Sequence, residues 1–367
     1  MKKYFFHLNK IDFLTLLPIM VLLGFSLMTI YALSQGSSVK DFSNFEKQTF
    51  FIFLGALVFL VFFLIDYRIW LNYSGILYLL GVFLMIAVLF WGTTVRNTSG
   101  WFVIGPFRLQ PAEAMKFFLI ISLASYFHKQ ATNGISWKEV MVSFVYVSIP
   151  SFLAMQQPDM GSVLVMFAIW GMMIFVAGLN WKQLLTLILL GVSALVLSWT
   201  FLLHDYQKKR LESFLDPQRD PQGSGYNVIQ SIVAVGAGGL RGQGLGLGSQ
   251  SQLNFLPEKH NDFIFASIAE QSGFLGTGLI FLMLSLLFWR IRKTIDIVSG
   301  NFGKFLATGV LAFLFFQTFI NIGMNIGIVP VAGISLPLVS YGGSFLLVTL
   351  AGLGLVQSVR RIARQNF

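Results

Sequence analysis

The sequence of 367 residues contains no cysteine and few charged residues. The absence of cysteine excludes disulfide frameworks, thiol catalysis and metal sites built on thiolates. Asp, Glu, Lys and Arg together make up 11% of the chain, which is too little charge to cover the surface of a soluble domain of this size. Hydrophobic residues make up 56%, including 39 Phe, and this excludes a disordered chain. The composition therefore predicts a polytopic membrane protein.

Long apolar runs recur along the whole chain. A hydrocarbon core of about 30 Å needs about 20 apolar residues per helix. This rule predicts an all-α integral membrane protein, a bundle of about ten transmembrane helices that forms a single domain over residues 1–367. The predicted spans are 13–33, 48–65, 71–91, 115–127, 140–157, 160–179, 184–203, 263–289, 305–325 and 344–357. The fourth and the last are short, which predicts tilted helices or chain that re-enters the membrane near Pro111 and Gly342.

The distribution of basic residues predicts the orientation. With the N-terminus inside, the cytoplasmic segments hold 14 Lys and Arg, whereas the short outer loops hold five. The positive-inside rule then places both termini in the cytoplasm and the long loop 204–262 outside. The net charge of +10 comes from basic residues scattered singly between apolar spans, so it predicts no nucleic-acid partner.

The loop after the third span ends in two opposite charges. Glu113 and Lys116 lie three residues apart, on one face of the helix that Pro111 would begin. They could form an ordinary surface ion pair. Alternatively, because charges at membrane depth are costly and usually line a cavity, they could belong to a site. Spacing alone leaves both interpretations open.

Asp262 lies directly before the apolar span 263–289. It could be the N-cap of that helix, or a general base at the membrane surface that accepts a proton from a substrate hydroxyl. Both interpretations stay open. Glu270 lies two turns further into the same helix, where an unpaired charge would be expensive, so we expect it to meet a partner or a polar cavity.

A glycine-rich tract covers residues 236–248. It has the register of neither nucleotide-binding glycine motif, and no strand precedes it, so we expect no nucleotide. It is either a flexible or closely packed loop or a set of backbone amides that binds a lipid pyrophosphate. The chain also lacks Asp-x-Asp and His-Glu-x-x-His, which argues against a metal-dependent nucleotide-sugar transferase and a zinc hydrolase. We expect no haem or flavin.

Four sequence blocks together resemble the SEDS family (shape, elongation, division and sporulation). The blocks are GPFRLQPAEAMK at 105–116, QQPDMG at 156–161, PEKHNDFIF at 257–265 and LPLVSYGGS at 336–344, in the order of the family. Residues 321–333 resemble the RodA branch more than the FtsW branch. Three positions depart from the family pattern, namely Ala112, Asn261 and Gln271, where Ser, Thr and Glu are usual.

The resemblance implies a peptidoglycan glycosyltransferase that polymerises Lipid II during elongation and shape maintenance, in the inner (plasma) membrane of a bacterium. It implies a class B penicillin-binding protein and other membrane proteins of the elongation complex as partners. Asp262 matches the essential acidic residue of the family and becomes the candidate general base. The candidates for substrate binding are Arg108, Glu113, Lys116, Asp159, Arg210, Glu258, Ser340 and Tyr341. A divalent cation, Mg²⁺ or Mn²⁺, is a candidate for neutralising the leaving pyrophosphate together with the basic residues.

Two other functions remain open at this point. Ten helices with Glu270, Asp159 and Asn325 inside them could line the path of a Lipid II flippase or another transporter. A non-catalytic scaffold could instead position a partner enzyme through small-residue faces such as Gly323-x-x-x-Gly327.

Overall fold

The computed structural model describes most of the chain between residues 12 and 364. Within this stretch the described part leaves out residues 36–40, 96–97, 106, 131–133, 202–207, 209–211, 220, 222, 224 and 254. Statements about the structure below refer to the described residues.

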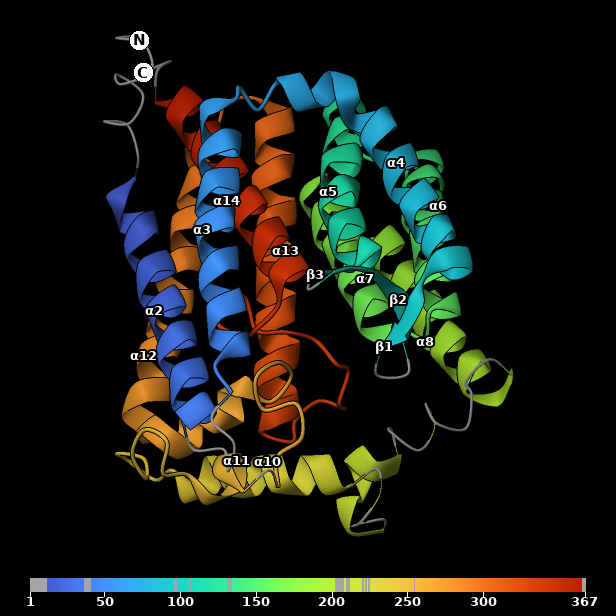
Figure 1. Ribbon diagram of the computed structural model, residues 1–367. Helices are drawn as coiled ribbons and strands as arrows, with labels where there is room; N and C mark the ends of the chain where they lie inside the picture. The colour runs from blue at the N-terminus through green and yellow to red at the C-terminus, as the bar shows by residue number, and fades with distance from the viewer. Residues whose placement is uncertain are drawn as a thin grey trace, which may run out of the picture.

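The described residues form a bundle of ten long helices (Figure 1). Each coincides with one predicted span, so the predicted all-α bundle is confirmed. The helices are α2 (Phe13–Gln35), α3 (Ser43–Leu64), α4 (Ile69–Trp91), α5 (Pro111–Gln130), α6 (Trp137–Gln156), α7 (Met160–Val176), α8 (Trp181–Phe201), α12 (Ile264–Ile297), α13 (Asn301–Asn325) and α14 (Gly343–Ala363). Seven of these are long and apolar enough to cross a membrane; α5, α7 and α8 are not among the seven.

The two helices that the sequence predicts as short are in fact full length. Helix α5 has 20 residues and α14 has 21. Hydropathy underestimates them because charged residues lie inside the helices, Glu113 and Lys116 in α5 and Arg360 and Arg361 in α14. All four side chains are buried.

Helix α13 lies at the centre of the bundle. It packs against α5, α7, α12 and α14, and α14 in turn packs closely along α3. Helix α2 begins and α14 ends at the same end of the bundle, which we call the terminal end (Figure 1). The opposite end, which we call the loop end, carries the short strands and helices α10 and α11.

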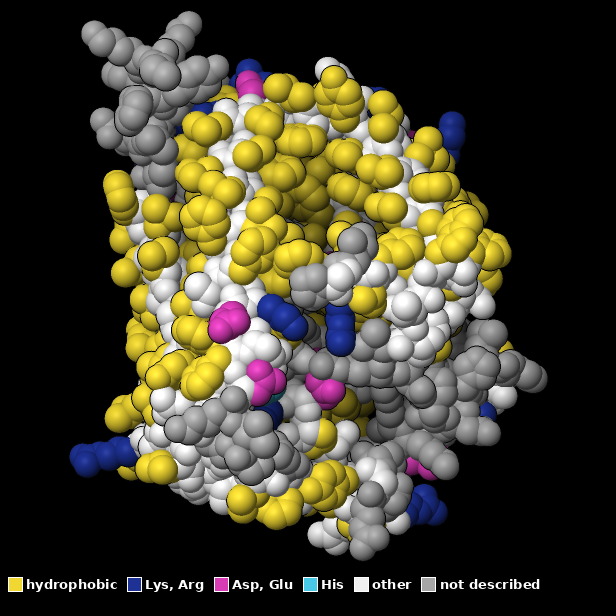
Figure 2. Space-filling view, in the orientation of Figure 1, with side chains coloured by type: hydrophobic (Ala, Val, Ile, Leu, Met, Phe, Trp, Pro, Cys, Tyr) yellow, Lys and Arg dark blue, Asp and Glu magenta, His cyan; other side chains and the backbone are white. Residues whose placement is uncertain are grey.

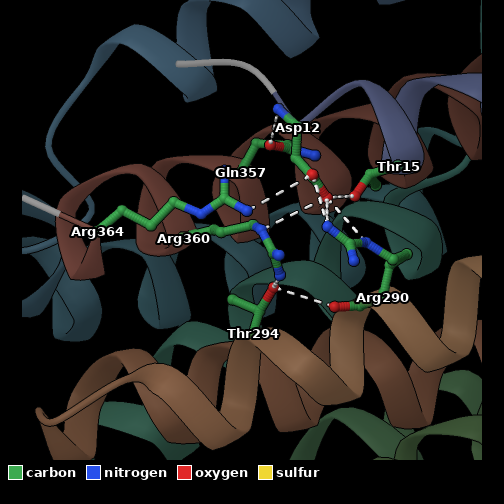
Figure 3. A network of polar contacts seen from close by, with 7 residues as sticks. All are labelled: Asp12, Thr15, Arg290, Thr294, Gln357, Arg360 and Arg364. Atoms are coloured by element: carbon green, nitrogen blue, oxygen red, sulfur yellow. Dashed lines mark hydrogen bonds and ion pairs between the residues drawn. The ribbon is translucent and has the colours of Figure 1, made fainter.

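At the terminal end, the start of the chain is tied to α12 and α14 (Figure 3). The carboxylate of Asp12 accepts hydrogen bonds from Nη2 of Arg290 at 2.6 Å and from Oγ1 of Thr15 at 2.6 Å. Nε of Arg360 and Nη2 of Arg364 lie 3.4 and 3.8 Å from the same carboxylate. The single acid therefore joins three segments that are far apart in the sequence.

At the loop end, a small antiparallel sheet leads from α4 into α5. Its strands are β1 (Thr93–Val95), β2 (Thr98–Ile104) and β3 (Phe107–Leu109), in the order β1-β2-β3. Arg108 of β3 pairs with Val103 of β2. The sheet leads into Pro111, the first residue of α5, and whether the chain re-enters the membrane here stays a prediction.

The segment 204–262 contains no long helix among its described residues. It contains the 3-10 turn η1 (Pro217–Arg219), helix α10 (Tyr226–Ala237) and helix α11 (Ser249–Gln252). Helix α10 runs across the loop end of the bundle (Figure 1). This arrangement fits a large loop region outside the hydrophobic spans.

Candidate active site

Asp262 lies at the loop end, two residues before Ile264, the first residue of α12. Its side chain is half-buried. Its backbone carbonyl accepts two hydrogen bonds from α13, from Nδ2 of Asn321 at 3.0 Å and from Nδ2 of Asn325 at 2.9 Å. The backbone of Asp262 is therefore fixed by the central helix of the bundle.

Asp262 is not the N-cap of α12. The N-cap is Phe263, which makes no side-chain capping bond. The first turn is instead capped by a different helix, because the backbone N–H of Ala266 donates to Oδ1 of Asn325 at 3.0 Å. The N-cap interpretation of Asp262 is therefore wrong, because Phe263 occupies the N-cap position.

The chain between α13 and α14 passes close to the Asp262 carboxylate. A Cβ atom placed on Gly333 would lie 3.7 Å from Oδ2 of Asp262, and Gly333 has a φ of +67°. A larger residue at this position would be strained, and its Cβ would lie in van der Waals contact with the carboxylate. The loop therefore forms one wall beside Asp262.

Two loops meet around Asp262. Oγ of Ser340 donates to the carbonyl of Asn261 at 2.7 Å, and the backbone N–H of Tyr341 donates to the carbonyl of His260 at 2.9 Å. Ser340 also accepts a bond from the N–H of Leu336 at 2.8 Å and is only 1% exposed. The buried Ser340 hydroxyl thus orients the loops, whereas Tyr341 is half-buried beside them.

Glu258 lies in the turn that precedes Asp262. Its φ is +51°, a strained conformation for a residue with a side chain. Its Oε2 accepts a hydrogen bond from Nδ2 of Asn261 at 3.0 Å. The structure thus brings Glu258, Asp262, Ser340 and Tyr341 into one group.

The second group lies in the first turn of α5. Nζ of Lys116 lies 2.7 Å from Oε1 of Glu113, and the residues are only 2% and 9% exposed. Lys116 also faces the ring of Phe313 on α13. The pair is therefore buried, so the interpretation as a surface ion pair is wrong.

Gln110 and Asp159 link this group to α7. Asp159 is the N-cap of α7, and its carboxylate accepts bonds from the N–H of Ser162 at 3.0 Å and from Nε2 of Gln110 at 2.9 Å. The backbone N–H of Gln110 donates to Oγ of Ser344 at 3.2 Å, and that hydroxyl donates to the carbonyl of Arg108 at 2.9 Å. Asp159 therefore organises the start of α5 and α7.

Residues 340–344 connect the two groups, because Ser340 and Tyr341 contact the Asp262 loop and Ser344 contacts the Arg108 strand. The side chain of Arg108 is exposed. Figure 2 shows acidic and basic side chains gathered on this face, between the apolar surface and the loop end. Arg210 lies outside the described residues.

Glu270 is fully buried and has partners, as expected from its depth. Its Oε1 accepts from the N–H of Gln250 at 2.7 Å, and its Oε2 accepts from the N–H of Ser251 at 2.9 Å. Nearby, Nζ of Lys259 donates to the carbonyl of Ser251 at 2.6 Å. Burial lowers the pKa of Lys259, and the negative charge of Glu270 opposes this shift. Glu270 thus anchors α11 to α12.

The glycine tract packs against a break in α12. At the break, Gly273 has φ +64° and ψ −160°. The N–H of Phe274 donates to the carbonyl of Gly239 at 2.9 Å, and the N–H of Gln243 donates to the carbonyl of Glu270 at 2.9 Å. A Cβ on Gly242 would lie 2.2 Å from the carbonyl oxygen of Gln271. The tract is therefore a closely packed loop, because only glycine allows this approach.

The structural roles of Asn321, Asn325 and Gln48 are not predicted by the motifs of the sequence. Gln48 is fully buried in α3, and its Nε2 donates to Oγ of Ser26 at 3.0 Å and to the carbonyl of Ser340 at 3.4 Å. The feature of the sequence that could have indicated these roles is a polar side chain within an apolar span. For Asn321 and Asn325, the spacing of four residues also places both side chains on one helix face.

The described residues contain no group of three or more His, Asp or Glu side chains that could hold a metal ion. The chain does not by itself form a closed cation site in this part of the structure.

The model of the family FTSW_RODA_SPOVE, described as "Cell cycle protein", matches residues 11–365. Peptidoglycan glycosyltransferase MrdB of Escherichia coli (strain K12) is 36% identical over 358 residues, covering 98% of this chain and 95% of the relative. Stage V sporulation protein E of Bacillus subtilis (strain 168) is 38% identical over 363 residues, covering 96% and 98%.

Two solved structures are similar over nearly the whole chain. One is a chain from a structure described as "Structural coordination of polymerization and crosslinking by a peptidoglycan synthase complex". Its TM-score is 0.81 and its sequence identity is 29%, and the match covers 97% of this chain and 99% of that chain. The other is the rod shape determining protein RodA of Thermus thermophilus, with a TM-score of 0.71 and 26% identity, covering 96% and 97%.

Proposed function

The chain belongs to the FtsW, RodA and SpoVE family, and we propose that it is a peptidoglycan glycosyltransferase that polymerises Lipid II into glycan strands during cell-wall elongation. The observation that carries the proposed mechanism is the position of Asp262. Its backbone is held by two asparagines of the central helix, while capping of α12 is left to Asn325. These bonds fix the backbone of Asp262, and its carboxylate lies beside Gly333 of the loop between α13 and α14 at the loop end.

The reaction is a single displacement at a sugar carbon. Asp262 takes the proton from the 4-hydroxyl of the acceptor sugar as its oxygen attacks the anomeric carbon of the donor. A carbon–oxygen bond forms between the sugars, and the bond to the lipid pyrophosphate breaks with its electron pair leaving on the phosphate oxygen. The displacement inverts an α-linked donor into a β-linked strand.

The leaving pyrophosphate needs positive charge. Arg108 is the candidate for direct contact, because its side chain is exposed beside the segment 340–344. Lys116 is paired with Glu113 and buried, so its proposed role is to set the local charge at the start of α5. Glu258 and Tyr341 are proposed to bind the sugars or the peptide of the substrate, and Asp159 to hold the start of α5.

We propose that a divalent cation binds at this site together with the substrate. Magnesium commonly keeps water and substrate phosphates as most of its ligands and takes one or two carboxylates from the protein. Glu258 and Asp262 would be those carboxylates, and the ion would neutralise the pyrophosphate. The steps above are assigned to the residues of the chain.

We also propose the inner (plasma) membrane of a bacterium as the location, with the terminal end cytoplasmic and the loop end outside. The excess of basic residues in the segments of the terminal end supports this orientation. A class B penicillin-binding protein is the proposed partner, together with other membrane proteins of the elongation complex. The support is the likeness to a protein of a peptidoglycan synthase complex that coordinates polymerization and crosslinking.

The geometry gives less support to a transporter. Glu270 and Asp159, which could line a path across the membrane, are bound by backbone amides at 2.7–3.0 Å and serve local structure.

One reconstitution separates the enzyme from a flippase and from a scaffold. The purified chain is incubated with defined Lipid II in detergent, with and without the penicillin-binding protein, and the products are separated by size. We expect the wild-type chain to make glycan polymer in at least one of the two mixtures. The Asp262→Asn chain should make no polymer in either mixture. Polymer that forms equally well with the Asp262→Asn chain would refute the proposed mechanism. Polymer whose formation depends on the active site of the penicillin-binding protein alone would favour the scaffold.

A further inference from the structure

A polar cavity opens between α4, α5 and α6 near the terminal end, far along the bundle from Asp262. Its volume is about 500 Å³, and its polar lining comes from Asn72, Ser74, Ser125, Tyr126, Lys129 and Tyr146, among others. Ser122, which also lines it, lies eight residues before the end of α5, so the cavity reaches about 12 Å along that helix. The cavity is large compared with a single water molecule.

Several donors that line this cavity lack a partner. Ser125 is only 6% exposed, yet among the described residues no hydrogen bond to its hydroxyl is formed. The amide of Asn72 and the ammonium group of Lys129 likewise have no partner in the described part of the chain. Ser122 differs, because its hydroxyl donates to the carbonyl of Ser74 at 3.0 Å. A buried hydroxyl without a partner is costly, so Ser125, together with the exposed side chains of Asn72 and Lys129, indicates a ligand that is rich in acceptors.

The charge around the cavity is positive. Lys129 lines it, and Arg68 and His128 line a neighbouring cavity of about 230 Å³ that shares Leu71 with it. The acidic Glu139 acts electrostatically on Tyr126 but does not line the cavity, and its carboxylate accepts a hydrogen bond from the N–H of Ser136 at 2.8 Å in the capping box of α6. Lys129 is therefore the charged group that lines the cavity itself.

We propose that this cavity binds the phosphate of a membrane glycerophospholipid from the leaflet at the terminal end. Lys129 provides the charge, and Ser125, Asn72 and the two tyrosine hydroxyls provide hydrogen bonds. Basic pockets between transmembrane helices on the cytoplasmic side are suited to such head groups. A lipid is favoured over free phosphate because α4 continues past the cavity with exposed apolar side chains, Ile76 and Leu79, along which acyl chains can lie.

The test uses native mass spectrometry of the full chain in detergent, titrated with phosphatidylglycerol. We expect one tightly held lipid per wild-type chain. Lys129→Gln should weaken this binding roughly tenfold to a hundredfold, because it removes a charge-assisted contact. Ser125→Ala should weaken it less, without disturbing the fold. The matched control is Lys182→Gln, since Lys182 is an exposed lysine in the first turn of α8 at the same end and does not line either cavity.

Three results would overturn the proposal. The first is a wild-type chain that retains no lipid, and the second is equal affinity of the wild-type and Lys129→Gln chains for phosphatidylglycerol. The third is displacement of the lipid by inorganic phosphate at a similar concentration, which would assign the cavity to a free anion. Thermal unfolding of each variant shows whether a loss of lipid reflects the site or a loss of fold.

Discussion

Asn325 holds Asp262 and the start of α12 with one fully buried side chain. Its Nδ2 donates to the carbonyl of Asp262 at 2.9 Å, and its Oδ1 accepts from the N–H of Ala266 at 3.0 Å. A residue of α13 thus caps the helix that follows the candidate base. The position of the Asp262 carboxylate therefore depends on the packing of α12 against α13.

Replacing Asn325 with Ala should lower both stability and activity. It leaves buried backbone groups of Asp262 and Ala266 with fewer partners, and each unsatisfied group costs about 1–3 kcal/mol. Asn325→Asp should keep the bond from Ala266 but lose the donor to Asp262. We expect the polymerisation rate of the Asn325→Asp chain to fall by more than its loss of stability, measured by the melting temperature, explains. Asn301→Ala, at the other end of α13, is the control, and equal effects at the two positions would contradict the positioning role.

Asp262→Asn should leave expression and thermal stability near those of the wild type, because the carboxylate does not cap α12. Polymerisation should fall by about 10²-fold or more, since the amide cannot accept the proton. Initial rates with Lipid II measure this loss. Asp216→Asn is the matched control, because Asp216 is exposed in the same long loop region. A well-folded Asp262→Asn chain with wild-type rates would end the general-base assignment.

The buried pair of Lys116 and Glu113 can be tested by a double substitution. Lys116→Met alone leaves the Glu113 carboxylate buried without its partner, which should cost about 3–5 kcal/mol of unfolding free energy. Adding Glu113→Gln should restore most of that stability. If the pair acts on the substrate, polymerisation stays low in the double variant. Recovery of activity together with stability would make the pair purely structural, and Lys182→Met serves as the control for a lost surface lysine.

Asp12 should make stability depend on pH in the acid range. Burial raises the pKa of Asp12, but hydrogen bonds from Arg290 and Thr15 and the positive charge of Arg360 outweigh it, so the pKa lies below its ordinary 3.8. The unfolded chain then takes up the proton more readily than the folded one. The stabilisation is therefore complete above about pH 4 and is lost as the pH falls through the folded pKa.

Thermal unfolding in detergent at a series of acid pH values measures this effect. Asp12→Asn should be less stable at neutral pH, because three arginines remain close together, and its stability should vary less on acidification. Asp296→Asn, which removes an exposed ion pair with Arg292 at the same end, is the control. An identical acid dependence in wild-type and Asp12→Asn chains would contradict the assignment.

The orientation can be tested with single cysteines, since the chain has none of its own. Gln218→Cys lies at the exposed turn η1 and Ser299→Cys at the exposed turn before α13, at opposite ends of the bundle. An impermeant maleimide applied to intact cells should label position 218 and leave 299 unlabelled. The reverse pattern would place Asp262 in the cytoplasm and refute an external polymerase site.

Sequence patterns were sufficient for the number and position of the long helices, because apolar length is a local property. They were insufficient where charge lies inside a helix. Helices α5 and α14 extend beyond the predicted spans 115–127 and 344–357. Their charged residues have partners in the fold, because Lys116 pairs with Glu113 and Arg361 donates to the carbonyl of Leu64. Only the folded chain supplies such partners.

The amino-acid sequence by itself determined the membrane class, the ten spans, and the residues Asp262, Glu113 and Lys116 as candidates, through composition, run length and motif spacing. The tertiary structure alone decided what these residues do locally. It assigned the capping of α12 to Asn325, buried the Glu113 and Lys116 pair, and joined Ser340 to Asn261 across 79 positions of sequence. These outcomes depend on which helices pack side by side, and hydrogen bonds between distant segments leave no periodic trace in a single sequence.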